Sequence, residues 1–166
     1  VRASGSPEVS EVTFQVQDSS GIPVDLNNSV QVNFSLVSGP NGEEFINPTS
    51  GFTSSGGLVK TSLFSGTIAG VVQLMATINV GSSTITSKPV AVTIHGGLPD
   101  SAHFSLAVEK LNFPGWAYYG LRDRITAYVG DKYTNPVRPG TPVYFSTTGG
   151  IIEGSTQTNQ TGEGSV

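Results

Sequence analysis

The residues that could do chemistry in this chain are few and scattered. Two histidines, His95 and His103, are its only imidazoles, and its carboxylates are spread through turn-like segments without a close pair. Nucleophilic catalysis needs a nucleophile beside a base, and the sequence has no Gly-x-Ser-x-Gly elbow, phosphate-binding loop or His-Glu-x-x-His motif. We therefore expect no catalytic site, no metal site and no cofactor, and we predict that the chain is not an enzyme.

Two aspartate-containing segments have a more specific chemistry. Residues 18–24 read Asp-Ser-Ser-Gly-Ile-Pro-Val and residues 131–137 read Asp-Lys-Tyr-Thr-Asn-Pro-Val, and each lies between two alternating apolar runs. An aspartate oxygen can accept hydrogen bonds from amides two residues on, and glycine can adopt positive φ. Proline removes an amide donor where a strand begins. The predicted turn-defining residues are Asp18, Gly21, Pro23, Asp131, Asn135 and Pro136.

A calcium site is the alternative use of the carboxylates near the middle of the chain, namely Asp100, Glu109, Asp123 or Asp131. Calcium takes about six to eight oxygen ligands, and no Asp-x-Asp or Asp-x-Asn pattern supplies them near these residues. The turn interpretation is therefore preferred for Asp131, and calcium stays open.

Trp116, Tyr118 and Tyr119 form the only dense aromatic cluster in the sequence. In one interpretation they pack against strand ends and the loops of the preceding module. In the other they form a platform on which sugar rings stack, because aromatic rings offer large apolar faces with a polar edge. These three residues are the candidates for ligand contact.

The composition argues against several classes of partner. The net charge is −4 and the eight basic residues form no stripe, which argues against nucleic acid. No apolar run approaches the length of a membrane span, and no basic amphipathic segment is present, so we expect no membrane contact in this segment. Cysteine is absent, which excludes disulfides and thiolate metal sites.

Short alternating apolar runs predict strands rather than helices. Residues 1–10 are polar and are expected to be frayed, apart from a short edge strand. We expect seven or so strands in the first module, packed as two facing sheets. The inward residues are expected to be Val12, Phe14 and Val16; Val30, Val32, Phe34 and Leu36; Val59, Thr61 and Leu63; Val72 to Val80 at alternate positions; and Val90, Val92 and Ile94 on one return strand over 84–94.

The pattern occurs twice. A shift of 113 positions places Val12, Phe14 and Val16 on Ile125, Ala127 and Val129, Asp18 on Asp131, and Val30 and Val32 on Val143 and Phe145. Such self-similarity indicates a repeated structural unit. The segment 95–100, His-Gly-Gly-Leu-Pro-Asp, is typical of a short hinge, so we predict modules over 1–96 and 97–166.

The second module matches the first only as far as about Thr61. We therefore expect it to lack its C-terminal strands, which would leave the inner faces of Ile125, Val129, Val143 and Phe145 partly uncovered. Such a module is expected to be marginally stable, or to associate, in isolation.

Three segments resemble bacterial immunoglobulin-like repeats of the invasin/intimin group: Gly-Leu-Pro-Asp-Ser-Ala-His-Phe-Ser at 97–105, residues 125–147, and Thr-Asn-Gln-Thr-Gly at 158–162. Members of that group typically show an alternating strand, Asp, a short turn, Asn-Pro-Val, a second strand ending in Phe, and a later Thr-x-x-x-Gly. The first module fits less closely, because Ile22 replaces the Asn and the loop after Val37 is longer.

The resemblance implies an all-β fold, an immunoglobulin-like β-sandwich in two tandem modules with the second truncated. It also implies a bacterial cell-surface or secreted protein, in which such repeats mainly space and stiffen while receptor binding lies in tip domains. We therefore expect structural repeats of an adhesin- or invasin-like stalk, with neighbouring repeats as partners and a host receptor or glycan bound through other domains. The alternative is a glycan- or receptor-binding module that uses the aromatic cluster at 116–119.

Overall fold

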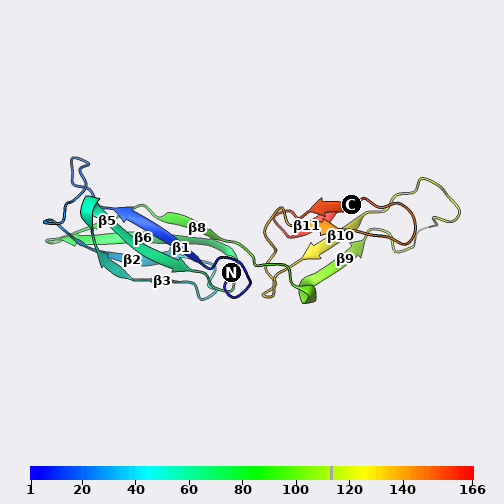
Figure 1. Cartoon of the computed structure of the whole chain (residues 1–166), viewed down its shortest axis with the longest axis horizontal. Coiled ribbons are helices and arrows are strands. Elements are labelled where there is room, and N and C mark those ends of the chain that lie inside the picture. Colours follow the sequence, from blue (N-terminus) through cyan, green and yellow to red (C-terminus); the bar gives the residue numbers. More distant parts are fainter. Residues whose placement is uncertain (113) are drawn as a thin grey trace. The chain divides into compact units, whose positions relative to one another are not determined.

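The computed structural model describes residues 1–112 and 114–166, and apart from two short 3-10 helices its regular elements are all β-strands. The all-β prediction is confirmed. The chain divides into two compact units, residues 1–94 and 95–166, each with its own strands (Figure 1).

One sheet of the first unit has three antiparallel strands in the order β1 (Val9–Gln15), β5 (Leu58–Phe64) and β3 (Phe45–Asn47). Side chains alternate between the two faces of a strand, so every second residue points inward. Val12, Val59 and Leu63 are buried, as the alternation predicts. The 3-10 helix η1 (Ser55–Gly57) leads directly into β5.

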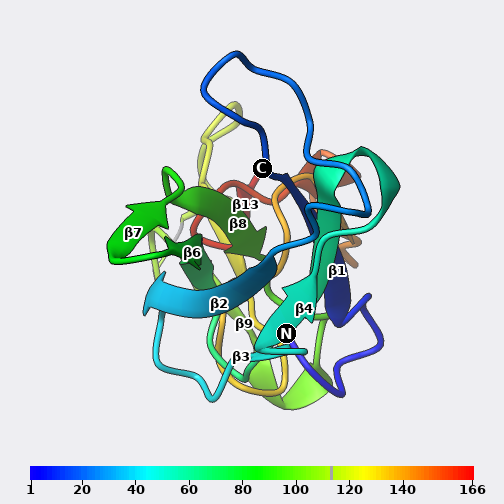
Figure 2. The same cartoon turned by 90° about the vertical axis from the view of Figure 1, so that its left-hand side faces the viewer.

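The facing sheet has five strands: β4 (Ser50–Phe52), β2 (Gln31–Ser38), β6 (Gly70–Val80), β7 (Ser83–Thr86) and β8 (Val90–Ile94). β2 pairs with β4 on one side and with β6 on the other, and β6 pairs in turn with β7 and β8. Val32 and Leu74 are buried between the sheets, and the Phe34 ring lies 5.6 Å from that of Phe14 on β1. Figure 2 shows the two layers, which form the predicted sandwich.

The prediction that residues 1–10 are frayed is wrong, although the edge strand that it allowed is present at the start of β1. The side chain of Val1 is buried, the amide of Arg2 donates to the carbonyl of Gly66 at 2.9 Å, and β1 already begins at Val9. Burial of the apolar side chain of Val1 stabilises this segment, although most residues of the segment are polar.

The predicted return strand over 84–94 is split into β7 and β8. The amide of Ser87 donates to the carbonyl of Ala76, and the Ser87 hydroxyl accepts from the Ala76 amide, just before Pro89, which has no amide to continue the ladder. Val80 is exposed rather than inward, because it pairs with β7 beyond Ile78, the last residue of β6 that pairs with β2.

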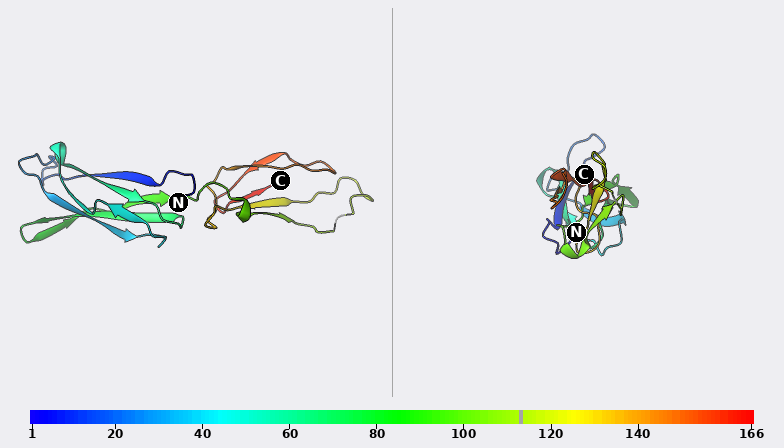
Figure 3. Two further views of the ribbon diagram at one scale, coloured as in Figure 1. Left: turned by 60° about the horizontal axis from the view of Figure 1, so that its bottom comes forward. Right: turned by 90° about the vertical axis from the view of Figure 1, so that its right-hand side faces the viewer.

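The second unit has two smaller sheets (Figure 3). One contains β9 (Phe104–Val108), β10 (Ile125–Val129) and β13 (Glu163–Ser165), with β10 in the centre, and it follows the 3-10 helix η2 (Ser101–His103). The other pairs β11 (Pro142–Tyr144) with β12 (Ser155–Gln157). The core consists of Ala127, Val129, Val137 and Val143, with Phe145 packed against it.

The predicted uncovered faces of the second unit are wrong in part. Val129 and Val143 are buried, and Ile125 and Phe145 are half-buried. On β9 the side chains of Phe104, Leu106 and Val108 are exposed.

Candidate functional site

The most tightly connected polar site of the second unit is the turn between β10 and the segment that begins at Pro136. The carboxylate of Asp131 is completely buried, with 0% exposure. One of its oxygens, Oδ1, accepts the amides of Tyr133 at 2.8 Å and Asn135 at 2.9 Å. The other, Oδ2, accepts the amide of Gly97 at 2.8 Å, and the Asn135 side-chain amide donates to both oxygens, at 3.1 and 3.0 Å.

This arrangement fixes the charge of Asp131. Burial alone would raise the pKa of the Asp131 carboxyl, because a charge is less stable away from water. The hydrogen bonds from the Gly97 amide, the Asn135 side chain and the Tyr133 and Asn135 amides outweigh that effect, and the pKa lies below its ordinary value. Asp131 is therefore a buried carboxylate saturated by donors, which holds a structure together and has no lone pair directed at a ligand.

Asp18 builds the same turn in the first unit but stays exposed. Its Oδ1 accepts the amides of Ser20 at 2.8 Å and Ile22 at 2.9 Å, matching the two bonds made by Oδ1 of Asp131. The carbonyl of Asp18 accepts from Gly21, just as that of Asp131 accepts from Thr134. What the first turn lacks is the second set of donors, because Ile22 occupies the place of Asn135 and has no side-chain amide.

The backbone around the two turns is also equivalent. The amide of Val16 donates to the carbonyl of Gly57, and that of Val129 donates to Gly162, both at 2.9 Å. Pro23 and Pro136 lie in equivalent isolated bridges, Gln17–Pro23 and Gly130–Pro136. Gly57 and Gly162 both have positive φ, and a Cβ at either would lie within 2.5 Å of a carbonyl oxygen.

The shift of 113 positions does not hold for the strand that follows the turn. Cross-strand pairing places Val32 opposite Gly51 and Val143 opposite Thr156, so Val143 corresponds to Val32 rather than Val30. Phe145 then corresponds to Phe34, since the amide of each donates to the chain beside it in the same way. The loop before this strand is two residues shorter in the second unit, and a change of two keeps the same face inward.

The turns differ at one strained position. Gly21 has φ of +79°, as a glycine tolerates, but the equivalent Thr134 has φ of +69°. A β-branched residue in the left-handed region is uncommon and unfavourable.

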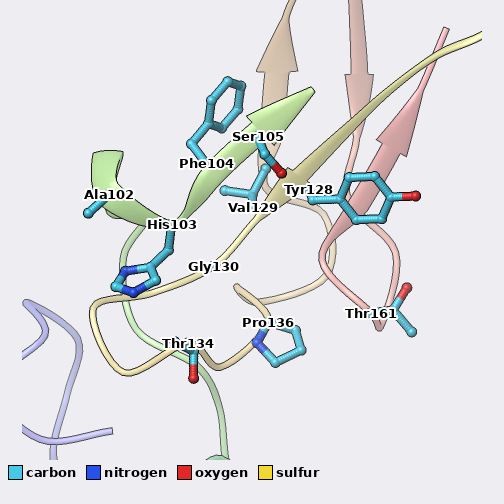
Figure 4. A pocket seen from close by; sticks show the side chains of 10 residues that line it. All are labelled: Ala102, His103, Phe104, Ser105, Tyr128, Val129, Gly130, Thr134, Pro136 and Thr161. Carbon is cyan, nitrogen blue, oxygen red and sulfur yellow. The ribbon is translucent and has the colours of Figure 1, made fainter. Parts of the chain in front are cut away.

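A shallow hollow of about 320 Å³ lies beside the Asp131 turn (Figure 4). His103, Tyr128 and Thr161 contribute side chains to its rim, and the His103 Nδ1 lies 2.8 Å from Oδ2 of Asp100.

Trp116 and Tyr119 are fully exposed, and Tyr118 is largely exposed. Within the second unit, the interpretation that the cluster packs against strand ends is wrong for Trp116 and Tyr119. Their loop is closed at its base, where the Glu109 amide donates to the Arg124 carbonyl and the Lys110 amide to Asp123. Phe113, in the same loop, lies outside the described residues.

Three of the four carboxylates named for calcium, those other than Glu109, accept hydrogen bonds from backbone amides. Asp100 accepts from Ala102, Asp123 from Lys110 and Arg124, and Asp131 from the donors given above. Within residues 1–112 and 114–166, no three histidine or acidic side chains come together as a metal site. The same residues include no helix long and apolar enough to cross a membrane.

The sequence pattern singled out Asp131, Asn135 and Pro136, and the structure brings them together. It did not indicate that Gly97 completes the site, because nothing local relates residues 34 positions apart. The one signal in the sequence for a more extensive site at the second turn was Asn135, which stands where the first turn has Ile22 and which adds a side-chain amide.

No family model and no curated protein matches this chain. Two solved structures are similar to it. The structure of FdeC, described as a broadly conserved Escherichia coli adhesin that elicits protection against urinary tract infections, is 18% identical over 97% of this chain and 50% of its own, with a TM-score of 0.59. The D0-D1 domain of intimin is 21% identical over 98% of this chain and 76% of its own, with a TM-score of 0.42.

The chain spans half the length of the FdeC structure that it matches. At this identity the likeness is one of fold. The predicted fold is confirmed: the chain has an immunoglobulin-like β-sandwich fold, and the FdeC structure is similar to it in fold.

Proposed function

We propose that this chain supplies immunoglobulin-like structural repeats, which space and stiffen a bacterial cell-surface or secreted protein of the adhesin or invasin kind. The observation that carries the proposal is the recurrence of one turn at Asp18 and Asp131, with the same two backbone amides bonded to Oδ1 in each. Repetition of a unit whose turn-forming carboxylates bond to backbone amides suits a structural role, since those groups are used to hold the chain itself.

The fold likeness to an E. coli adhesin supports this proposal. The partners proposed are neighbouring repeats of the same protein, and a host receptor or glycan would be bound by other domains. The buried Asp131 supports a stiff repeat, because its bond to Gly97 ties the start of the second unit to the turn.

A surface-display fusion tests the spacing role. The chain is placed between an outer-membrane anchor and an epitope tag on capsulated bacteria, and antibody binding to the tag is measured. A Gly/Ser segment of equal length is the control, because its mean reach grows only as about the square root of residue number. The folded chain should expose the tag more strongly than the Gly/Ser segment. Equal or weaker exposure would contradict a spacing role.

The exposed aromatic loop favours a second candidate function, glycan or receptor binding through Trp116, Tyr118 and Tyr119. Large aromatic side chains in water are costly and are frequent in binding sites. A glycan array probed with the chain and with Trp116→Ala tests it, and Tyr144→Ala, at another exposed tyrosine, is the matched control. This candidate requires binding that Trp116→Ala abolishes and Tyr144→Ala preserves. Binding that survives Trp116→Ala would discard it.

A further inference from the structure

The shallow hollow beside the Asp131 turn is lined by uncharged groups. Its lining residues include no lysine, arginine, aspartate or glutamate. Tyr128 on β10 is 43% exposed and Pro136 is exposed, so two rings present apolar surface there. In the view of Figure 4, Thr161 lies on the same side of Pro136 as Tyr128, and His103 lies on the other side. At about 320 Å³ the hollow is at the small end of the range of ligand pockets, about 300–1,000 Å³.

His103 is held in one position at the edge of the hollow. Its carbonyl accepts the Gly130 amide at 2.8 Å, and its own amide donates to the Asp100 carbonyl at 3.1 Å. An ionised carboxylate can only accept a hydrogen bond, so the His103 Nδ1 donates to Oδ2 of Asp100. The neutral ring then has Nε2 as a free acceptor. Gly130 permits this close packing, because a Cβ there would lie 3.1 Å from the His103 Cβ.

Thr134, on the rim of the hollow, is not the residue that the turn requires. The equivalent Gly21 makes the same backbone hydrogen bond to the aspartate of its turn, with φ of +79° against +69° for Thr134. A β-branched residue in this region is unfavourable, and strained residues of this kind are concentrated at functional sites. The Thr134 hydroxyl donates to the Tyr133 carbonyl, so its oxygen can still accept a hydrogen bond from a ligand.

The strands that complete a repeat do not cover this place. The first unit contains β6, β7 and β8, and its Gly21 and Gly56 hold the positions of Thr134 and Thr161. A Cβ at either glycine would meet nothing within 4 Å. The surface is therefore open in a unit that has these strands, and the second unit places two threonine side chains on it.

We propose that this hollow binds one neutral pyranose ring of a glycan. The site is separate from the aromatic loop at 116–119 and goes beyond a spacing role. The apolar face of the sugar packs on the Tyr128 ring, and sugar hydroxyls bond to His103 Nε2 and to the hydroxyls of Thr134 and Thr161.

The lining decides the class of ligand. A phosphate or carboxylate would lose water without meeting a cation, so anionic ligands are disfavoured. A hydrocarbon would leave His103 Nε2 and the threonine hydroxyls without partners. A neutral pyranose has both an apolar face and a ring of hydroxyls, so it satisfies both conditions. The first unit has Gln15 in place of Tyr128 and therefore offers no ring at the equivalent position.

The test follows the amide NMR signals of the isotope-labelled full chain during titration with methyl glycosides of glucose, galactose, mannose and N-acetylglucosamine. Methyl glucuronide is the charged counterpart of methyl glucoside. Tyr128→Ala removes the ring, and Tyr144→Ala, at another exposed tyrosine, is its matched control. Thr134→Gly separates binding from folding, because it relieves the strain and removes the hydroxyl together. Unchanged signals elsewhere in the spectrum verify that each variant is folded.

We expect at least one neutral glycoside to shift the amides around the hollow with a Kd of about 1–10 mM, and to leave the equivalent amides of the first unit unshifted. Tyr128→Ala should weaken this binding about tenfold and Thr134→Gly about threefold, while Tyr144→Ala and Trp116→Ala leave it unchanged. Methyl glucuronide should bind more weakly than methyl glucoside.

Three results would overturn the proposal. The first is the absence of saturable shifts with all four neutral glycosides. The second is binding that Tyr128→Ala does not weaken, or that Trp116→Ala abolishes, because the sugar would then be bound elsewhere. The third is binding as strong in Thr134→Gly as in the unaltered chain, since the threonine would then have no part in the site.

Discussion

Replacement of Asp131 by asparagine is the sharpest perturbation of the second unit. In D131N the remaining side-chain oxygen would still accept the amides of Tyr133 and Asn135, while the substitution removes the negative charge and changes the other atom from an acceptor to an NH₂ donor. In the unaltered chain that atom, Oδ2, accepts from Gly97 and from the Asn135 side chain. Each buried donor left without a partner costs about 1–3 kcal/mol, and a turned Asn135 amide would relieve part of this. We expect a loss of about 2–4 kcal/mol in the free energy of unfolding of the second unit.

Asp18→Asn is the matched control in the first unit. Asp18 is exposed and uses only Oδ1 as an acceptor in the turn, which asparagine retains, so the expected change is within about 0.5 kcal/mol. Hydrogen exchange measured by mass spectrometry in increasing urea reports on residues 1–94 and 95–166 separately in one sample. If D131N shifts the second unit no more than Asp18→Asn shifts the first, the reasoning from the saturated carboxylate is refuted.

The same site predicts a pH dependence. The pKa of Asp131 in the fold lies below its ordinary value of 3.8, so the unfolded chain binds a proton more readily than the folded one. The stabilisation is then complete above the unfolded pKa and is lost as the pH falls through that value toward the folded pKa. Unfolding of the second unit between about pH 5 and pH 2 should show this loss. The difference between the unaltered chain and D131N should shrink over the same interval, and a constant difference would contradict the assignment.

Two backbone predictions follow from the turn. Gly162→Ala places a Cβ 2.5 Å from the Val129 carbonyl oxygen at φ of +77°, so it should destabilise the second unit by about 2–3 kcal/mol. Gly140→Ala is the control, because Gly140 has φ of +87° but lies in open space, and it should cost about 1 kcal/mol. Thr134→Gly relieves a left-handed β-branched residue and should stabilise the unit by about 0.5–1 kcal/mol, while Lys132→Gly, where φ is not positive, should destabilise it. Urea denaturation of the four variants checks both, and equal effects within either pair would contradict the geometry.

Most of the first unit could be predicted because its alternation is unambiguous. Val12, Phe34, Val59 and Leu74 each lie in a run where every second residue is apolar, and each is buried. The errors at Val80 and over 84–94 have another origin. They depend on which strand lies opposite and how far it extends, and period-two patterning carries no information about strand length across a sheet.

The candidate site was predictable only where it is local. The turn at Asp131 follows from the residues within five positions of it, but the Gly97 bond joins segments far apart in the sequence. The exposure of Phe104, Leu106 and Val108 was also not predictable, because their spacing is that of a buried strand face and only the reach of the opposite sheet decides whether they are covered. The alternation of apolar residues therefore predicted which side chains favour burial, and the arrangement of the strands determined which of them are buried.

The small core of the second unit makes the Asp131 network important for its stability. In the described part of this unit four buried apolar residues form the core, with Phe145 packed against them, so the polar network carries a large share of a small total.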